Sequence, residues 1–190
     1  MAKASAIDVF RKIVFAHFML ARTRQTLHER KEELVIAAIA EFASRGFDAG
    51  STQAIAAAAG ISQPYLFKVW KSKSALFLAA LDTVYDRIIG AFVAAAEGKP
   101  ASVETLTEVG DVYERLSRSE MQMLLQGFAA CDNREVRDLV ERRWMDLIAV
   151  LERIAGQGGD PIQHFLGVGL LMTVVRTADM PESALLCQAS

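Results

Sequence analysis

The chain has 190 residues, of which 52% are hydrophobic and 23% are charged, and its formal net charge is −2. A chain of this length can bury a good core as one or two small domains, and this composition excludes a disordered tail. The net charge excludes a protein that is basic throughout. Nine basic and seven acidic residues lie from Arg22 to Arg87, against nine and fifteen from Ile88 to Ser190. This contrast fits DNA binding confined to the N-terminal end, with chance variation as the alternative.

The cysteines and histidines indicate neither a disulfide framework nor a metal site. Cys131 and Cys187 are the two cysteines, which points to a reducing compartment, and we expect a cytoplasmic protein. His17, His28 and His164 lie far apart, and no metal-binding spacing such as CxxC or HExxH occurs. We therefore expect no metal site and no cofactor.

Residues 1–24 are expected to be an N-terminal extension, either helical or disordered. The apolar run from Ile13 to Ala21 is too short to span a membrane. A basic start and an apolar centre also occur in signal peptides, but Arg-Thr-Arg-Gln follows here. An extra amphipathic helix, or an upstream extension that adds little, is the favoured interpretation, and Met19 would make a natural start.

The segment from Glu29 to Arg45 is predicted to form the first helix of a small domain. Its apolar residues form one broad stripe at helical spacing, namely Leu34, Val35, Ala38, Ile39 and Phe42. Gly46 is expected to end this helix, and Phe47 to fill the core beside it.

The stretch from Ser51 to Lys73 contains two short apolar-patterned segments separated by Ala59-Gly60-Ile61-Ser62. Thr52 is placed to N-cap the first segment, and Ser62 to N-cap the second. Gly60 can adopt the positive φ that ends a helix, and Pro64 falls in the first turn of the next helix, where its missing N–H does no harm. This pattern predicts a helix-turn-helix, and an ordinary pair of packed helices is the alternative.

The remainder of the chain is predicted to be helical, and the fold class is all-α. A long helix is expected over Ser74–Glu97, ended by Gly98-Lys99-Pro100. Ser102 is expected to cap a helix that runs to about Leu116, and another segment carries Met121 and Phe128. Two further helices are expected over 133–155 and 161–177. The last is apolar on all sides, so it must be covered on several sides.

Several motifs in order resemble the DNA-binding domain of TetR-family transcriptional repressors. They are the Ala-rich helix ending Phe-Ala-Ser-Arg-Gly-Phe, then Thr-Gln-Ala-Ile-Ala, Ala-Gly-Ile-Ser, and Leu-Phe-Lys-Val-Trp-Lys-Ser-Lys-Ser-Ala-Leu. The resemblance covers about Arg30 to Leu81. It implies a three-helix helix-turn-helix DNA-binding domain over 25–78. It also implies a C-terminal helical domain over 79–190 that binds a ligand and forms dimers.

Polar residues on and around the second short helix are the candidates for DNA contact. Gln can pair with adenine and Lys with guanine, and a proline or tyrosine ring can pack on a thymine methyl. Gln63, Tyr65 and Lys68 are therefore the candidates for base reading, and Thr52, Lys71 and Lys73 are the candidates for phosphate contact. The family usually has Tyr where this chain has Phe67, and Tyr or His where it has Val69. The candidate DNA-binding residues are Thr52, Gln63, Pro64, Tyr65, Phe67, Lys68, Lys71 and Lys73, and each could instead be an ordinary solvated residue.

Aromatic and sulfur-containing residues of the C-terminal part are candidates for the lining of an apolar ligand pocket, with core packing as the alternative. The candidates for the lining are Phe92, Tyr113, Met123, Phe128 and Trp144. Gln126 and Cys131 could supply polarity. The resemblance further implies that the last two helices form a four-helix interface between two copies. The candidates for that interface are Trp144, Leu147, Leu151, Phe165, Val168, Leu170, Leu171 and Val175. In the alternative, the last helix is the central core helix of a monomer.

The sequence therefore predicts a homodimeric DNA-binding regulator, a repressor released from a palindromic operator by a small apolar ligand. Its expected partners are double-stranded operator DNA, a second copy of the chain and an unidentified small-molecule effector, with no membrane. Activation of transcription is an alternative that the sequence leaves open. A helical small-molecule carrier or an enzyme is another, but no carboxylate pair or nucleophile–base set supports catalysis, so we expect no enzyme.

Overall fold

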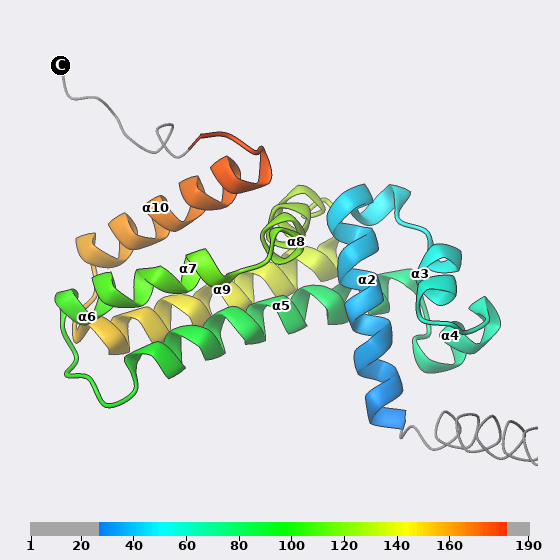
Figure 1. Cartoon of the computed structure of the whole chain (residues 1–190), viewed down its shortest axis with the longest axis horizontal. Helices are drawn as coiled ribbons and strands as arrows, with labels where there is room; N and C mark the ends of the chain where they lie inside the picture. The colour runs from blue at the N-terminus through cyan, green and yellow to red at the C-terminus, as the bar shows by residue number, and fades with distance from the viewer. Residues whose placement is uncertain (1–26, 182–190) are drawn as a thin grey trace, which may run out of the picture.

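The computed structural model describes residues 27–181, and this part of the chain consists of helices joined by short loops, without a strand. The expected extension over residues 1–24, the start suggested at Met19 and the cysteine at position 187 lie outside the described residues. The helices form one elongated assembly, with α2, α3 and α4 at one end (Figure 1). The prediction of an all-α fold is confirmed.

The first three helices form the helix-turn-helix unit, which comprises α2 (Leu27–Ala49), α3 (Thr52–Ala58) and α4 (Gln63–Val69). Its core is fully buried and combines the α2 stripe with one or two residues from each short helix, namely Leu34, Ala38, Phe42, Ile55, Ala56 and Leu66. The α2 backbone leaves helical geometry at Gly46 (φ 76°), and one further turn follows. Phe47 packs edge-on against Phe77 with the ring centroids 5.0 Å apart, so this turn contacts the long helix that follows the helix-turn-helix unit.

The capping pattern of the two short helices agrees with the sequence at α4 and differs at α3. Ser62 caps α4 by accepting from Tyr65 N, and Gly60 has a φ of 66° in the preceding turn. The expectation that Thr52 caps α3 is wrong, because Ser51 accepts from Ala54 N and Thr52 is the first helical residue. Ser51 holds this position because its own N–H donates to Glu41 Oε1 of α2 at 2.9 Å.

Helix α5 (Lys73–Ala96) runs the length of the molecule away from the helix-turn-helix unit (Figure 1). Ser72 caps it, which places its start one residue before the expected Ser74. Its apolar residues form a buried stripe, namely Leu76, Phe77, Ala80, Leu81, Val84, Ile88 and Phe92, and Tyr85 is buried with them.

The C-terminal helices enclose α5 from several sides. The single helix expected over 102–116 is three short pieces, α6 (Val103–Glu108), the 3₁₀ turn η1 (Val109–Asp111) and α7 (Val112–Arg115). Gly110, with its low helix propensity, lies in the 3₁₀ turn. They are followed by α8 (Arg118–Ala129), α9 (Arg134–Ala155) and α10 (Asp160–Thr177).

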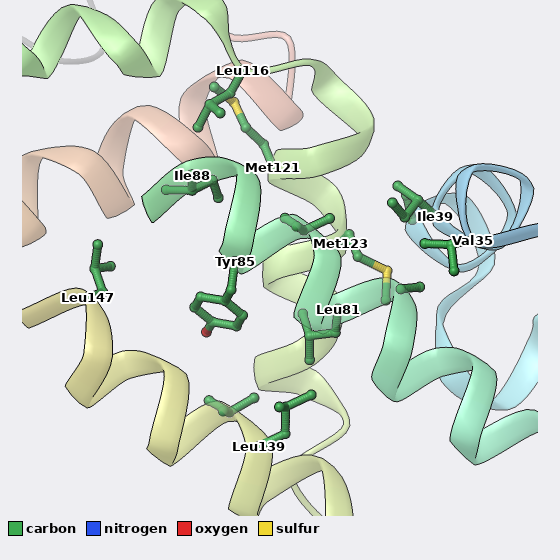
Figure 2. Close-up of a cluster of buried hydrophobic side chains, with 14 of the residues drawn as sticks. Val35, Ile39, Leu81, Tyr85, Ile88, Leu116, Met121, Met123, Leu139 and Leu147 are labelled. Carbon is green, nitrogen blue, oxygen red and sulfur yellow. The ribbon is translucent and has the colours of Figure 1, made fainter. Parts of the chain in front are cut away.

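Helix α8 joins the helix-turn-helix unit to the rest of the molecule, because it packs against both α2 and α5. Two glycines make this approach close. A Cβ on Gly127 would lie 2.9 Å from both methyl carbons of Leu81, and one on Gly46 would lie 2.7 Å from Gln126 Oε1. Figure 2 shows the resulting core, in which Met123 of α8 lies with Leu81 and Tyr85 of α5. The helix-turn-helix unit is thus packed firmly on the C-terminal part.

Candidate nucleic-acid interface and effector cavity

Helix α4 presents one buried anchor and an exposed face. Leu66 is fully buried, whereas Pro64, Tyr65, Phe67 and Lys68 are exposed. The exposed fractions of Tyr65 (38%) and Phe67 (41%) are large for aromatic side chains. A short helix that is fixed on one side and exposes polar and aromatic groups on the other can enter a DNA groove.

The half-buried side chain of Gln63 is oriented by Thr52. Gln63 Nε2 donates to Thr52 Oγ1 over 2.8 Å, so the first residues of α3 and α4 are joined. One amide N–H and the amide oxygen of Gln63 remain for other partners, which is the donor and acceptor pair that adenine recognition requires.

The two lysines that follow α4 have different surroundings. Lys71 is exposed. Lys73 is half-buried, and its Nζ donates to the backbone oxygen of Asp48 over 2.8 Å and lies 5.6 Å from the centre of the Phe47 ring. Lys73 therefore also holds the last turn of α2 to the start of α5. The exposed Lys31 was not among the predicted DNA-binding residues, and it lies near the same unit, with its Nζ 5.8 Å from the centre of the Trp70 ring. Lys31 lies in the second turn of α2, and no spacing in the sequence relates it to Trp70.

A small, largely apolar cavity of about 30 Å³ lies between α5, α7, α8, α9 and α10, with the exposed Leu170 at its edge. Three of the expected pocket residues line it, namely Tyr113, Phe128 and Trp144. The sequence argument missed Tyr85, Ile88 and Thr173, which also line it. The sequence does indicate that Tyr85 faces inward, because it follows Leu81 by four residues and precedes Ile88 by three.

The other four expected pocket residues do not line this cavity. Phe92 is buried in an aromatic cluster, with its ring centre 5.5 Å from those of both Tyr113 and Phe165. Met123 is buried in the core, and Gln126 lies against Gly46. The Cys131 thiol donates to the backbone oxygen of Gly127. Their positions depend on how α8 packs on α2, which helical spacing alone does not reveal.

Two buried tyrosines give the cavity its polar character. Burial raises the pKa of Tyr85 to about 12, an effect that Cys131 adds to and Arg143 opposes. Burial also raises the pKa of Tyr113 to about 12. The Tyr85 hydroxyl has no hydrogen-bond partner among the described residues. Both phenols are neutral near pH 7 and can act as donors.

A second, wider space opens beside the cavity. It is a groove of about 310 Å³ between α10 and the α6–η1–α7 segment. Tyr113 and Gly169 line both spaces.

The expected interface residues divide into a buried and an exposed set. Leu147, Leu151 and Val175 are buried within the single chain, so their side chains belong to its core. Phe165 and Trp144 are half-buried. Val168, Leu170 and Leu171 are exposed by 42–44%, and the neighbouring Val174 by 40%. Helix α10 therefore has one covered side and one exposed apolar side.

Within residues 27–181, no group of three or more side chains could hold a metal ion, and no helix is long and apolar enough to cross a membrane.

The helix-turn-helix unit matches a family model described as bacterial regulatory proteins of the tetR family, over residues 34–80. The N-terminal helix-turn-helix unit is therefore similar to that of the tetR-family regulators. A curated relative is also similar: the HTH-type transcriptional activator FasR of Mycolicibacterium smegmatis is 39% identical over 61 residues. That match covers 32% of this chain and 28% of FasR.

Solved structures show a likeness in fold over most of the chain. FadR of Bacillus subtilis, in complex with stearoyl-CoA, has a TM-score of 0.62 at 14% identity and covers 81% of this chain and 91% of its own. A TetR-family member from Streptomyces coelicolor has a TM-score of 0.62 at 20% identity, over 83% and 94%. A TetR-like regulator from Rhodococcus sp. RHA1 has 0.60 at 23%, over 85% and 92%. At these identities the likeness shows the fold of the C-terminal part.

Proposed function

We propose that this chain is a transcriptional repressor that binds a palindromic operator as a homodimer and is released by a small apolar ligand. The exposed face of α4, with Gln63 oriented by Thr52, carries the proposal. In this arrangement Gln63, Tyr65 and Lys68 read bases, with Pro64 and Phe67 packed against the groove. Thr52, Lys71 and Lys73 contact phosphates, which position the protein without reading sequence.

The exposed apolar side of α10 supports the dimer. Four side chains there are 40–44% exposed, and they form a contiguous helical face: Val168, Leu170, Leu171 and Val174. Water in contact with such a face is unfavourable, and a second copy related by a two-fold axis would cover both faces at once. The same symmetry would present two α4 helices to two half-sites.

DNA binding and effector binding are assigned to two domains that both include part of α5. We place the boundary between the DNA-binding domain (25–78) and the regulatory domain (79–190) inside this helix, so the two domains share it. The cavity and groove beside α5 are the proposed effector site, and their apolar lining suits an apolar ligand. The Bacillus subtilis neighbour was solved with stearoyl-CoA, whose acyl chain is apolar, so this fold can bind an apolar chain. We infer no enzymatic activity, because the family acts by binding.

Electrophoretic mobility shift with the promoter region of the chain's own gene tests the DNA-binding function. Wild type should bind with a salt-dependent affinity, and Gln63→Ala with Lys68→Ala should abolish the preference for that DNA over a scrambled duplex. The matched control is Gln157→Ala with Lys99→Ala, which removes the same two residue types at exposed positions outside the helix-turn-helix unit. A chain that binds no DNA at low salt would instead be a small-molecule carrier.

Activation is the second candidate function, because the similar FasR is an activator. In vitro transcription from the bound promoter separates the two. A repressor lowers the transcript yield when it occupies its site, whereas an activator raises it.

A further inference from the structure

Tyr113 lies between the small cavity and the wider groove. It lines the cavity of about 30 Å³ on one side and the groove of about 310 Å³ on the other. The cavity alone has room for about one water molecule, which is too little for an effector. The groove is at the lower end of the size range of ligand sites, roughly 300–1,000 Å³. The position of the Tyr113 ring therefore decides whether the chain has one usable site or two separate spaces.

The ring of Tyr113 lies in space that a side chain at position 169 would fill. A Cβ built on Gly169 would be 2.1 Å from the Tyr113 hydroxyl oxygen and 2.3 Å from the adjoining ring carbon. The backbone at Tyr113 is held to α10, because Arg176 donates to the carbonyl oxygens of Tyr113 and Glu114. With the backbone held, a rotation about the side-chain bonds is the motion that would join the two spaces.

Tyr85 supplies a hydrogen-bond donor in the small cavity. Its hydroxyl is buried and has no partner among the described residues, which is costly unless a water or a ligand satisfies it. Figure 2 shows its side chain directed from α5 towards α9, where Leu139 and Leu147 lie. Because the phenol stays protonated at neutral pH, it suits a ligand group that accepts a hydrogen bond.

The charges along the groove disfavour an anionic ligand group. Its lining carries Asp111, Glu114 and His164, and neither Lys nor Arg lines the cavity or the groove. The nearby Arg143 guanidinium, 5.9 Å from the centre of the Tyr85 ring, is already paired with Asp82, Asp86 and Asp146. A ligand carboxylate would therefore lose its hydration there without gaining an unpaired Lys or Arg.

We propose that Tyr113 is a movable wall whose rotation joins the cavity and the groove into one channel. The channel takes an elongated, uncharged apolar molecule whose single hydrogen-bond acceptor meets the Tyr85 hydroxyl. The inference deepens the proposed function, because it names the chemical class of the effector and the residue that admits it.

Two small probes with the same carbon skeleton test the proposal. They are 4-phenylbutan-2-one, which has one carbonyl acceptor, and n-butylbenzene, which has none. Trp144 lines the cavity, and a ketone quenches indole fluorescence on contact, so binding is followed in a Trp70→Phe background. The hydrocarbon is measured by competition. Wild type should prefer the ketone by about tenfold, the effect of one well-made buried hydrogen bond.

Three variants separate the two roles. Tyr85→Phe should lose the ketone preference and bind n-butylbenzene at least as tightly as the ketone, because the carbonyl would be buried without a donor. Tyr113→Phe, the matched control at the other buried tyrosine, should keep the tenfold preference. Tyr113→Ala removes the wall and should speed ketone association by about tenfold or more, with the preference retained. Thermal unfolding establishes that each variant is folded.

Three results would overturn the proposal: a ketone preference that survives Tyr85→Phe, association in Tyr113→Ala no faster than in wild type, or no binding of either probe by folded wild type and Tyr113→Ala. The measurement uses no DNA. Its failure would leave DNA binding untouched, and failure of the mobility shift would not affect it.

Discussion

The side-chain amide of Gln63 donates to Thr52 Oγ1, so the first residue of α4 is fixed by the first residue of α3. This bond changes the role that Thr52 can have. A residue that only contacts phosphate affects all sequences equally, whereas a residue that orients Gln63 affects the base that Gln63 reads. The two roles can be separated experimentally.

Thr52→Val should relax base preference at the position that Gln63 reads. The change keeps the shape of the side chain but removes the acceptor for Gln63 Nε2, so the amide is no longer oriented. We expect a loss of discrimination of about 1 kcal/mol at one base pair of each half-site. Selection from a randomised operator library measures it. Thr52→Ser, which keeps the acceptor, is the control, and a uniform loss on all sequences would show that Thr52 acts on phosphate instead.

Lys68→Ala and Lys73→Ala should differ in both specificity and stability. Lys68→Ala should cost roughly 1–3 kcal/mol of binding free energy at one base pair. Because Lys68 is exposed, the change should leave the folding stability unchanged. Lys73→Ala should weaken binding to all sequences and reduce the salt slope by about 1. Because Lys73 also donates to the Asp48 carbonyl, its loss should lower the free energy of unfolding by about 1 kcal/mol.

The salt dependence of operator binding and urea unfolding of both variants test this pair. Lys71→Ala, at an exposed lysine, should change the salt slope alone. Equal effects of Lys68→Ala and Lys73→Ala on sequence preference would contradict the division between base and phosphate contact.

Leu171→Arg should separate two chains without unfolding either. Leu171 is 42% exposed on α10, so a charged side chain there can reach water in a single chain but would be unpaired inside a dimer interface. We expect a shift from dimer to monomer by light scattering, with loss of operator affinity and a nearly unchanged circular dichroism spectrum. Val175→Arg, at a buried position of the same helix, should unfold the chain. A wild-type monomer at micromolar concentration would contradict the interface.

Stability should fall at alkaline pH because of the two buried tyrosines. Their pKa values of about 12 in the folded chain exceed the ordinary value of 10.0. The contribution is therefore complete below pH 10 and is lost as the pH rises towards 12. The loss should reach about 2 kcal/mol per tyrosine, by the usual linkage of pKa and stability.

Urea unfolding at a series of alkaline pH values measures this loss. Tyr85→Phe with Tyr113→Phe should flatten the alkaline part of the stability curve while leaving its neutral part nearly level. An unchanged alkaline slope in the double variant would assign the loss to other groups.

Effector and operator should weaken each other's binding by the same factor. A 100-fold loss of operator affinity corresponds to a coupling of about 2.7 kcal/mol, within the usual range for allostery. By reciprocity, operator DNA must then weaken effector binding 100-fold. Titration of an effector with and without operator tests this. Equal effector affinities would indicate a regulator that does not respond to a small molecule.

Local features were predictable from the sequence because their causes are local. Ser62 and Ser102 cap helices as expected, and Gly60 adopts a positive φ where the first short helix ends. Each depends on a few neighbouring residues. The cap of α3 was the exception, because Glu41, ten residues away, holds Ser51 in the capping position.

The cavity was only partly predictable because it depends on packing between distant helices. An aromatic or methionine side chain on a helix is either core or pocket lining, and the choice is made by whichever helix lies opposite. Met123 and Gln126 face α2 and the Gly46 turn, since Gly127 lets α8 approach Leu81 closely. No spacing within α8 indicates that approach.

The uninterrupted length of α5 makes it a lever. Its 24 residues, at a rise of 1.5 Å each, span about 36 Å from Lys73 to the end that faces the groove and the aromatic cluster. A rotation of about 5° about one end would displace the other by roughly 3 Å. That displacement is close to the rise of one base pair, about 3.4 Å. We therefore expect an adjustment of the Tyr113 ring that turns α5 through its contact with Phe92 to shift α4, together with the packed α2, relative to its half-site.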